Sequence, residues 1–238
     1  MEKLKIQILN YFKGLEFKED THKYSFDSKP IKISVSGLIK NFYEEFDSYT
    51  VSLRIAERDG LNQKDILKGW ENTGKVASKR GNKAHTFGEN YPFNRALKPS
   101  DKLEEAIVKF WNDLPEYIVP VIMELKMFHK EFMFAGTADI LLYNTITKTF
   151  IIGDYKTNKD LFKNFQNKKM LGVFNNLLDN PFNHYQLQLS FYQILFEQNG
   201  FKVSSRKLIW LLDDGTYKMY NMDDYTQQLQ EQLKIISI

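Results

Sequence analysis

The spacing of hydrophobic residues changes near Val119, from a helical period before it to a strand period after it. Residues 101–113 predict an amphipathic helix, whose apolar face consists of Leu103, Ala106, Ile107 and Phe110. Three strands are predicted next, at residues 119–128, 134–143 and 148–156. Hydrophobic residues occupy both faces of the last two strands, so we expect a sheet that is covered on both sides.

Shorter patterns flank this central region. Before it, two short strands and two helical regions are predicted, at residues 15–20, 22–27, 34–47 and 50–90. Ser34 or Ser36 is expected to cap the first helix, and Gly60 and Gly69 are expected to break the second region. After it come a helix, a hairpin turned at Asp214-Gly215 and a polar helix, at residues 184–200, 207–222 and 223–236.

This order of elements is typical of a mixed α/β fold rather than of regular βαβ repeats. Residues 1–238 are expected to form one domain with three parts. These are an N-terminal part (1–118), a core (119–212), and a C-terminal hairpin with a helix (207–238). An aromatic share of 15% is enough to build a large core for it.

Composition narrows the functional classes. The formal net charge is only +3, so nucleic-acid binding would depend on local basic patches. Cysteine is absent, which excludes disulfides, cysteine-ligated zinc and iron–sulfur clusters. No apolar run approaches the roughly 20 residues that span a bilayer, and the first residues lack the layout of a signal peptide. We therefore expect a soluble cytoplasmic protein without a membrane partner.

Two aspartates are expected to face each other on the second and third central strands. About five residues connect these strands, which is too short for a parallel crossover and predicts an antiparallel hairpin. A symmetric turn centred between Ile146 and Thr147 places Asp139 directly opposite Asp154, with Cβ atoms about 5 Å apart. Such a clash of like charges is relieved by a retained proton or by a bound cation. Among cations, Mg²⁺ best suits carboxylate oxygens.

Lys156 follows Asp154 by two residues, so on a strand both side chains point to the same face. A lysine beside two carboxylates can orient a water molecule, help to deprotonate it, or stabilise charge on a phosphate. The alternative is a surface ion pair between Asp154 and Lys156, with Asp139 in a turn.

These residues stand in motifs that resemble the PD-(D/E)XK nuclease superfamily, in its RecB-like exonuclease branch. The central motifs are GTAD at 136–139 and IIGDYKT at 151–157. GNKAH, with Gly81 four residues before His85, and the QxxxY pattern from Gln188 to Tyr192 also match that branch. Residues 22–39 are similar to the opening segment of phage-encoded and mitochondrial genome-maintenance relatives, and the resemblance covers about residues 15–210.

The resemblance implies a restriction-endonuclease-like core, a central mixed β-sheet flanked by helices. It implies metal ligation by His85, Asp139 and Asp154, and a catalytic role for Lys156. Gln188 and Tyr192 would contact the substrate or brace the site. We expect one or two Mg²⁺ ions, for which Mn²⁺ would substitute, with the carbonyl of Tyr155 as a further ligand. The iron–sulfur cluster of some RecB-like relatives is excluded by the lack of cysteine.

The implied activity is metal-dependent DNA exonuclease action, from free ends of single-stranded or frayed DNA, in recombination, repair or replication. The relatives suggest a phage origin, and hence the host cytoplasm. The sequence contains no helicase motif, so the nuclease would act alone or with a replication or recombination protein. Two alternatives stay open: a structure-specific or RNA-directed endonuclease of the same fold, and a DNA-binding module without catalysis.

Three further residues near the proposed site each have two interpretations. His85 follows Ala77 and Gly81 at helical steps, and these small residues would let a helix approach the sheet. It is therefore either a metal ligand or an ordinary helix-face histidine. Glu89, one turn later, either supports the ligands or is solvated. Glu124 either points inward to position water or a ligand, or is an edge-strand charge.

A basic and aromatic segment follows the third central strand. Residues 160–180 are expected to be partly irregular, and within 159–170 the lysines alternate with Phe162 and Phe165. Lysines suit phosphates and rings suit unpaired bases, so Lys163, Phe162 and Phe165 are candidate contacts to single-stranded nucleic acid; a solvated helix with a phenylalanine anchor is the alternative. A second basic cluster beside His85 consists of Lys75, Lys79, Arg80 and Lys83. His22, His129 and His184 are expected to be structural or surface residues.

Overall fold

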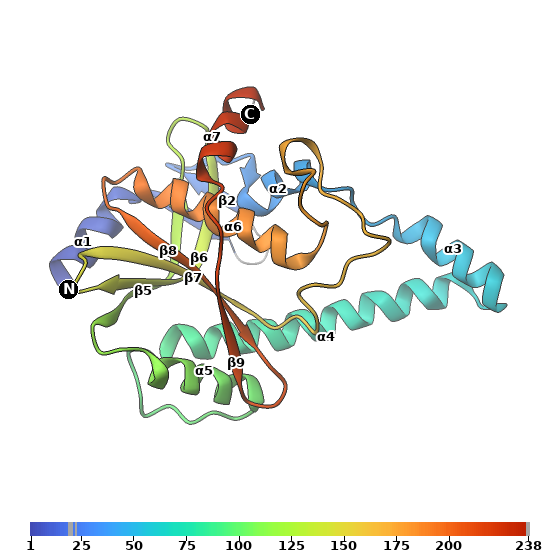
Figure 1. The fold of residues 1–238 in the computed structure, drawn as a ribbon, viewed down its shortest axis with the longest axis horizontal. Helices are drawn as coiled ribbons and strands as arrows, with labels where there is room; N and C mark the ends of the chain where they lie inside the picture. The colour runs from blue at the N-terminus through green and yellow to red at the C-terminus, as the bar shows by residue number, and fades with distance from the viewer. Residues whose placement is uncertain (19–20, 22, 237–238) are drawn as a thin grey trace.

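The computed structural model describes residues 1–18, 21 and 23–236, and shows a mixed sheet between two groups of helices (Figure 1). The predicted α/β class is therefore confirmed. The main sheet consists of β4 (Ile33–Ser34), β5 (Ile118–Phe128), β6 (Phe134–Asn144), β7 (Thr149–Lys156), β8 (Val203–Leu211) and β9 (Tyr217–Asn221). A smaller antiparallel sheet consists of β1 (Leu15–Lys18), β2 (Lys23–Phe26) and β3 (Lys29–Pro30).

Helices cover both faces of the main sheet, as the sequence predicts. The helices are α1 (Glu2–Tyr11), α2 (Val35–Ile39), α3 (Ser48–Asp59), α4 (Gln63–Asn90), α5 (Lys102–Asp113), α6 (Pro181–Glu197) and α7 (Thr226–Ile235), with short 3₁₀ turns at Lys40–Phe42 and Gly172–Phe174. Ile140 and Leu142 pack with residues of α4 and α5, while Leu141 between them packs with residues of α2 and α6. This alternation along β6 separates two hydrophobic cores, one on each face.

The predicted hairpin between β6 and β7 has the expected register. Its ladder runs from Asn144 opposite Thr149 to Ile140 opposite Gly153, which corresponds to a turn centred between Ile146 and Thr147. The side chain of Asn144 accepts hydrogen bonds from the N–H groups of Ile146 and Thr147, at 2.9 Å and 3.1 Å, and so fixes the turn. The ladder ends one position before Asp139 and Asp154.

A gap in the sheet follows from how β6 is paired. One edge of β6 pairs with β5 from Ala135 to Asn144. The other edge pairs with β4 at Phe134 and Ala135, and with β7 from Ile140 onward. Between these two partners, residues 136–139 have no strand neighbour on that edge within the described part of the chain. The GTAD motif occupies this gap.

Strand β7 continues beyond the gap because it is held from its other side. It pairs in parallel with β8 from Ile151 to Lys156, and β8 forms an antiparallel hairpin with β9. The hairpin turns at Asp214 and at Gly215, whose φ is +86°. Helix α6 provides the crossover that a parallel pair requires.

The long helix α4 corrects one prediction. The expected break at Gly60 is confirmed, because this glycine has a left-handed φ of +66° and ends α3. The expected break at Gly69 is wrong, because α4 runs without interruption from Gln63 to Asn90. A single exposed glycine costs a helix only about 1 kcal/mol, which the other turns of a long helix can offset.

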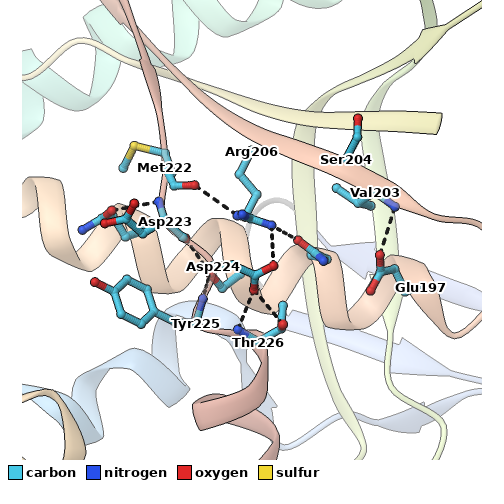
Figure 2. Close-up of polar contacts among 12 residues, drawn as sticks. Glu197, Val203, Ser204, Arg206, Met222, Asp223, Asp224, Tyr225 and Thr226 are labelled. Carbon is cyan, nitrogen blue, oxygen red and sulfur yellow. Dashed lines mark hydrogen bonds and ion pairs between the residues drawn. The ribbon is translucent and has the colours of Figure 1, made fainter. Parts of the chain in front are cut away.

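Segments close to both termini pack against the rest of the described chain. Helix α1 was not predicted; Ile8 within it and Phe12 directly after it are buried. Ser34, one of the two expected caps, accepts a hydrogen bond from the N–H of Gly37 at 3.2 Å. At the other end, buried Arg206 on β8 binds the segment that leads into α7 (Figure 2). No helix in the described ranges is long and apolar enough to cross a membrane.

Candidate functional site

The gap in the sheet is bridged by a side chain instead of a strand. The N–H of Tyr155 on β7 donates a hydrogen bond of 2.8 Å to Oδ2 of Asp139 on β6. Asp139 therefore takes the place of a backbone acceptor at the point where β6 and β7 separate. Asp139 and Asp154 are both buried there, at 8% and 2% exposure, which is unusual for carboxylates.

His85, Glu124 and Asp139 come together from three elements, α4, β5 and β6. Nδ1 of His85 lies 3.3 Å from Oδ2 of Asp139 and 3.8 Å from Oε1 of Glu124. One ligand atom from each residue lies within 4.8 Å of the others. The structure thus places His85 beside Asp139. Glu124 points inward, which is one of the two positions expected for this residue.

Glu124 reaches this cluster through a local distortion of β5. Its neighbours Met123 and Leu125 stay in register with Ile140 and Ala138, but Glu124 itself has a φ of +52°. Residues other than glycine rarely adopt this left-handed backbone conformation, because the side chain makes it strained. Such strain persists where the surroundings impose it, and it often marks a functional residue.

Asp154 and Lys156 form the second half of the site. Their side chains make an ion pair on one face of β7, as the two-residue spacing predicts. The Lys156 ammonium also lies 4.5 Å from the centre of the Tyr185 ring on α6, in a cation–π contact. The pair is buried between the sheet and α6, so the alternative of a surface ion pair is wrong.

The protonation states follow from these contacts. Burial and the carboxylate of Asp139 raise the pKa of Asp154 to about 7. Burial opposes protonation of His85, but Asp139 and Glu124 outweigh it and raise the imidazole pKa to about 10. Burial likewise opposes the charge of Lys156, but Asp154 and Asp139 outweigh it and raise its pKa.

The donor set fits a divalent cation. Among the described residues, the carboxylates of Glu124, Asp139 and Asp154 are gathered around two cationic side chains, His85 and Lys156. Carboxylate oxygens with one imidazole suit Mg²⁺ or Mn²⁺. An imidazole must be neutral to bind a metal ion, so metal binding would release the proton from His85. Asp154 does not belong to the tight cluster of three; it faces Lys156 on the other side of the gap.

The approach of α4 to the sheet has a different cause from the one expected. Ala77 and Gly81 line an open cavity next to His85 and do not make the closest contact. Helix α4 instead touches the sheet at Gly88, where an added Cβ would lie 2.6 Å from the ring of Tyr155. The Tyr155 ring is fixed in turn, because its hydroxyl accepts a 2.7 Å hydrogen bond from Nε1 of Trp111.

Two adjacent cavities lie beside the gap, to which Gly136 and Thr137 belong. The larger has a volume of about 800 Å³ and contains His85, Glu124 and Glu89 in its lining. The smaller, of about 230 Å³, is lined by Gln188 and Tyr192 of α6. The residues shared by both linings are Phe17, Tyr24 and Thr137. The cleft therefore runs from α4 across the end of β6 to α6.

Gln188 and Tyr192 are brought close to the GTAD motif. Nε2 of Gln188 donates a 2.6 Å hydrogen bond to the hydroxyl of Tyr192. Gly136 permits the approach of the tyrosine, because a Cβ there would lie 2.8 Å from the Tyr192 ring. This geometry agrees with a bracing role, one of the two that the resemblance implies.

The basic and aromatic segment is irregular rather than helical. Phe162 packs against Phe182, at 4.9 Å between ring centres, and against Trp210 and Tyr220. Phe165 is 75% exposed, and Lys163 is exposed. Phe162 thus packs against other rings although it is 47% exposed, and Phe165 and Lys163 remain accessible to a ligand.

Most of the second basic cluster is neutralised within the chain. Lys75 pairs with Glu71, Lys83 pairs with Asp101, and Arg80 pairs with Asp213 of the β8–β9 turn. This cluster therefore offers less charge to phosphates than its sequence indicates.

Two of the remaining histidines have structural contacts. His184 bonds Asp179 at 2.8 Å, and Nδ1 of His129 accepts from the N–H of Phe132. His22 lies outside the described residues.

Sequence reasoning missed the roles of Phe17, Tyr24 and Thr137. The hydroxyl of Tyr24 lies 2.8 Å from Oγ1 of Thr137, and so ties the small sheet to the strand that carries Asp139. The strand pattern of residues 15–27 was the available signal, but it does not say what the small sheet packs against.

Comparison with known protein families finds none that matches this chain, and comparison with curated proteins finds no similar sequence.

Proposed function

We propose that the chain is a metal-dependent nuclease with a restriction-endonuclease-like core, and that it hydrolyses phosphodiester bonds in DNA. The observation that carries this proposal is the pair of charged clusters on either side of the β6–β7 gap. His85, Glu124 and Asp139 lie on one side, and Asp154 with Lys156 lies on the other. The first cluster borders a cleft that is open to solvent, through His85 and Glu124.

The fold supports the proposal at a coarser level. A mixed sheet, flanked by helices, carries its acidic residues on an antiparallel hairpin that ends at the gap. The resemblance to PD-(D/E)XK nucleases implies this arrangement. It also implies the braced Gln188–Tyr192 pair on α6.

In the proposed mechanism, each side chain has a defined task. His85, Glu124 and Asp139 would hold the cation from one side, and Asp154 with the Tyr155 carbonyl from the other. A bound Mg²⁺ would supply Lewis-acid stabilisation of the phosphate and make water a better nucleophile. In the absence of metal, Asp154 and Asp139 raise the pKa of Lys156, so its side chain is an ammonium. Of the tasks considered for it, stabilisation of negative charge on the phosphate is therefore favoured over removal of a proton.

A strand end is the substrate that this cleft suits best. Phe17 and Tyr24 line the same cavity as His85 and Glu124. The exposed Phe165 and Lys163 follow β7 in the sequence. Such a combination suits unpaired nucleotides, by base stacking and phosphate contact. The resemblance to RecB-like nucleases implies action from a free end, so the proposed activity is exonucleolytic, on single-stranded or frayed DNA.

A digestion panel tests the proposal. Linear single-stranded DNA should be degraded with Mg²⁺ or Mn²⁺ and spared with EDTA, while closed single-stranded circles resist and RNA is cut more slowly. Equal cleavage rates on circular and linear DNA would show that the activity is endonucleolytic and not exonucleolytic. No cleavage of any of these substrates with either cation would contradict the proposal.

A further inference from the structure

The ammonium of Lys156 is held by two contacts of different kinds. On β7 itself, it forms an ion pair with the carboxylate of Asp154. From α6, the ring of Tyr185 approaches it, with 4.5 Å between Nζ and the centre of the ring. The Lys156 side chain is only 15% exposed, so contacts with the chain replace most of the water that would otherwise surround the charge.

The ring of Tyr185 is itself fixed relative to β7. Its hydroxyl donates a 2.9 Å hydrogen bond to Oδ1 of Asn158, two residues after Lys156. The carbonyl of Asn158 accepts a 2.7 Å hydrogen bond from Nε1 of Trp210, the residue of β8 that pairs with Lys156. The segment that leaves β7 is therefore attached to both α6 and β8, and this sets the position of the ring beside the ammonium.

The two contacts differ in what they leave free on the lysine. An ammonium has three N–H donors, and a carboxylate accepts such donors in directed hydrogen bonds. The face of a ring attracts the positive charge through its quadrupole and provides no such acceptor. The ring thus holds the nitrogen in place, while N–H groups remain able to donate to the oxygens of a phosphate. Under the proposed function, Asp154 also holds a cation, and a carboxylate shared with a cation attracts the ammonium less.

We propose that Tyr185 is a positioning residue, whose aromatic face holds the Lys156 ammonium at the phosphate during hydrolysis. The hydroxyl of Tyr185 has the lesser task of aiming the ring, through Asn158. Tyr185 acts through Lys156 and does not itself bind the reacting phosphate. This inference rests on the proposed nuclease function and extends its site to a residue of α6 outside the Gln188–Tyr192 pair.

Kinetics on linear single-stranded DNA with Mg²⁺ test this role. Tyr185→Leu and Tyr185→Met remove the ring and should lower kcat about tenfold with KM within about twofold, because the cation–π contact is lost. Tyr185→Phe keeps the ring and should stay within about threefold of wild type, since one hydrogen bond is a modest loss. Tyr11→Leu is the matched control, because Tyr11 has the Lys130 ammonium 4.0 Å from its ring centre and lines neither cavity beside the gap.

A double-mutant cycle separates positioning of Lys156 from a general structural effect. In a Lys156→Ala background, Tyr185→Leu should cause no further loss of kcat, because the group that the ring holds is already absent. A further tenfold loss in that background would show that Tyr185 acts independently of Lys156, and would overturn the proposal.

Nuclear magnetic resonance gives a readout that does not depend on cleavage. In metal-free protein with ¹³C-labelled lysine, the ring current should shift the ε-protons of Lys156 upfield, and Lys156→Arg identifies their signal. The shift should persist in Tyr185→Phe and disappear in Tyr185→Leu. Absence of the shift in the unchanged protein, or a wild-type kcat in Tyr185→Leu, would overturn the positioning role and leave the nuclease proposal intact. A normal shift in a protein that cleaves no substrate would overturn the nuclease proposal, and with it the catalytic purpose of the contact.

Discussion

Helix α6 borders two polar clusters that differ in how their charges are balanced. On one side, Arg206 donates to the carbonyl of Met222 at 3.3 Å, to Oδ2 of Asp224 at 3.0 Å, and to Gln193 of α6 (Figure 2). Asp224 is bound in turn by the N–H and hydroxyl of Thr226, at 2.9 Å and 2.6 Å. One cation, one carboxylate and neutral groups thus satisfy one another.

On the other side lies the cluster at the gap, where the charges are not balanced. Three buried or half-buried carboxylates meet one lysine and one histidine, and one carboxylate, that of Asp154, has its pKa raised to about 7. Arg206 is as buried as Asp139, each at 8% exposure, so burial of a charged side chain alone does not separate structure from function. What separates them is that the Arg206 cluster is complete within the chain, whereas the gap cluster is completed by protons or by a cation.

The largest expected effect is on cleavage. Lys156→Ala and Asp154→Ala should each reduce turnover of linear single-stranded DNA by about two orders of magnitude or more, because each removes a charge placed at the phosphate or its cation. Circular dichroism should show an intact fold for both. Lys3→Ala and Asp65→Asn, which change exposed residues, are the controls. Near-normal turnover in either site variant would reject its assignment.

The Arg206 cluster should respond in stability and not in chemistry. Arg206→Met leaves the Met222 carbonyl, Gln193 and Asp224 without their shared donor, and should lower the free energy of unfolding by about 2 to 3 kcal/mol. Urea unfolding measures this, with the exposed Lys202→Met as control. The rise in melting temperature that Mg²⁺ causes should be the same in Arg206→Met as in the unchanged protein. An equal loss of stability in Arg206→Met and Lys202→Met would show that the Arg206 cluster makes no specific contribution to stability.

The smallest effect is the pH dependence of stability without metal. The pKa values of Asp154 and His85 are raised by folding, so the folded state binds more protons than the unfolded chain. The stability that they contribute should therefore be lost as pH rises, through about 7 for Asp154 and toward about 10 for His85.

Thermal melting in EDTA between pH 5 and 9 measures this decline. Asp154→Asn should make the melting temperature less dependent on pH near neutral pH. Added Mg²⁺ should raise the melting temperature more at high pH, because binding requires the deprotonated groups. A metal shift that is independent of pH, or absent in the wild type, would contradict the site.

The local features of the site could be predicted from sequence, and the long-range ones could not. The register of β6 and β7 follows from a short symmetric turn, which brings Asp139 and Asp154 to the same level. The inward position of Glu124 depends on a backbone distortion, of which the residue type gives no sign.

The aromatic wall formed by Phe17 and Tyr24 depends on how a separate sheet packs beside β6. The failure at Gly69 has a similar origin, because the persistence of α4 depends on its whole length. Pairings close in sequence were thus predictable, while contacts between distant segments needed the structure.

The parallel pairing of β7 with β8 has a consequence for how the protein is made. Ribosomes deliver His85, Glu124, Asp139, Asp154 and Lys156 before Val203, where β8 begins. Until α6 and β8 have been translated, β7 lacks the neighbour that extends it past the gap. The proposed activity would therefore arise only after β8 has been translated, so a nascent chain that already carries these charged residues but lacks β8 would not cleave nucleic acid.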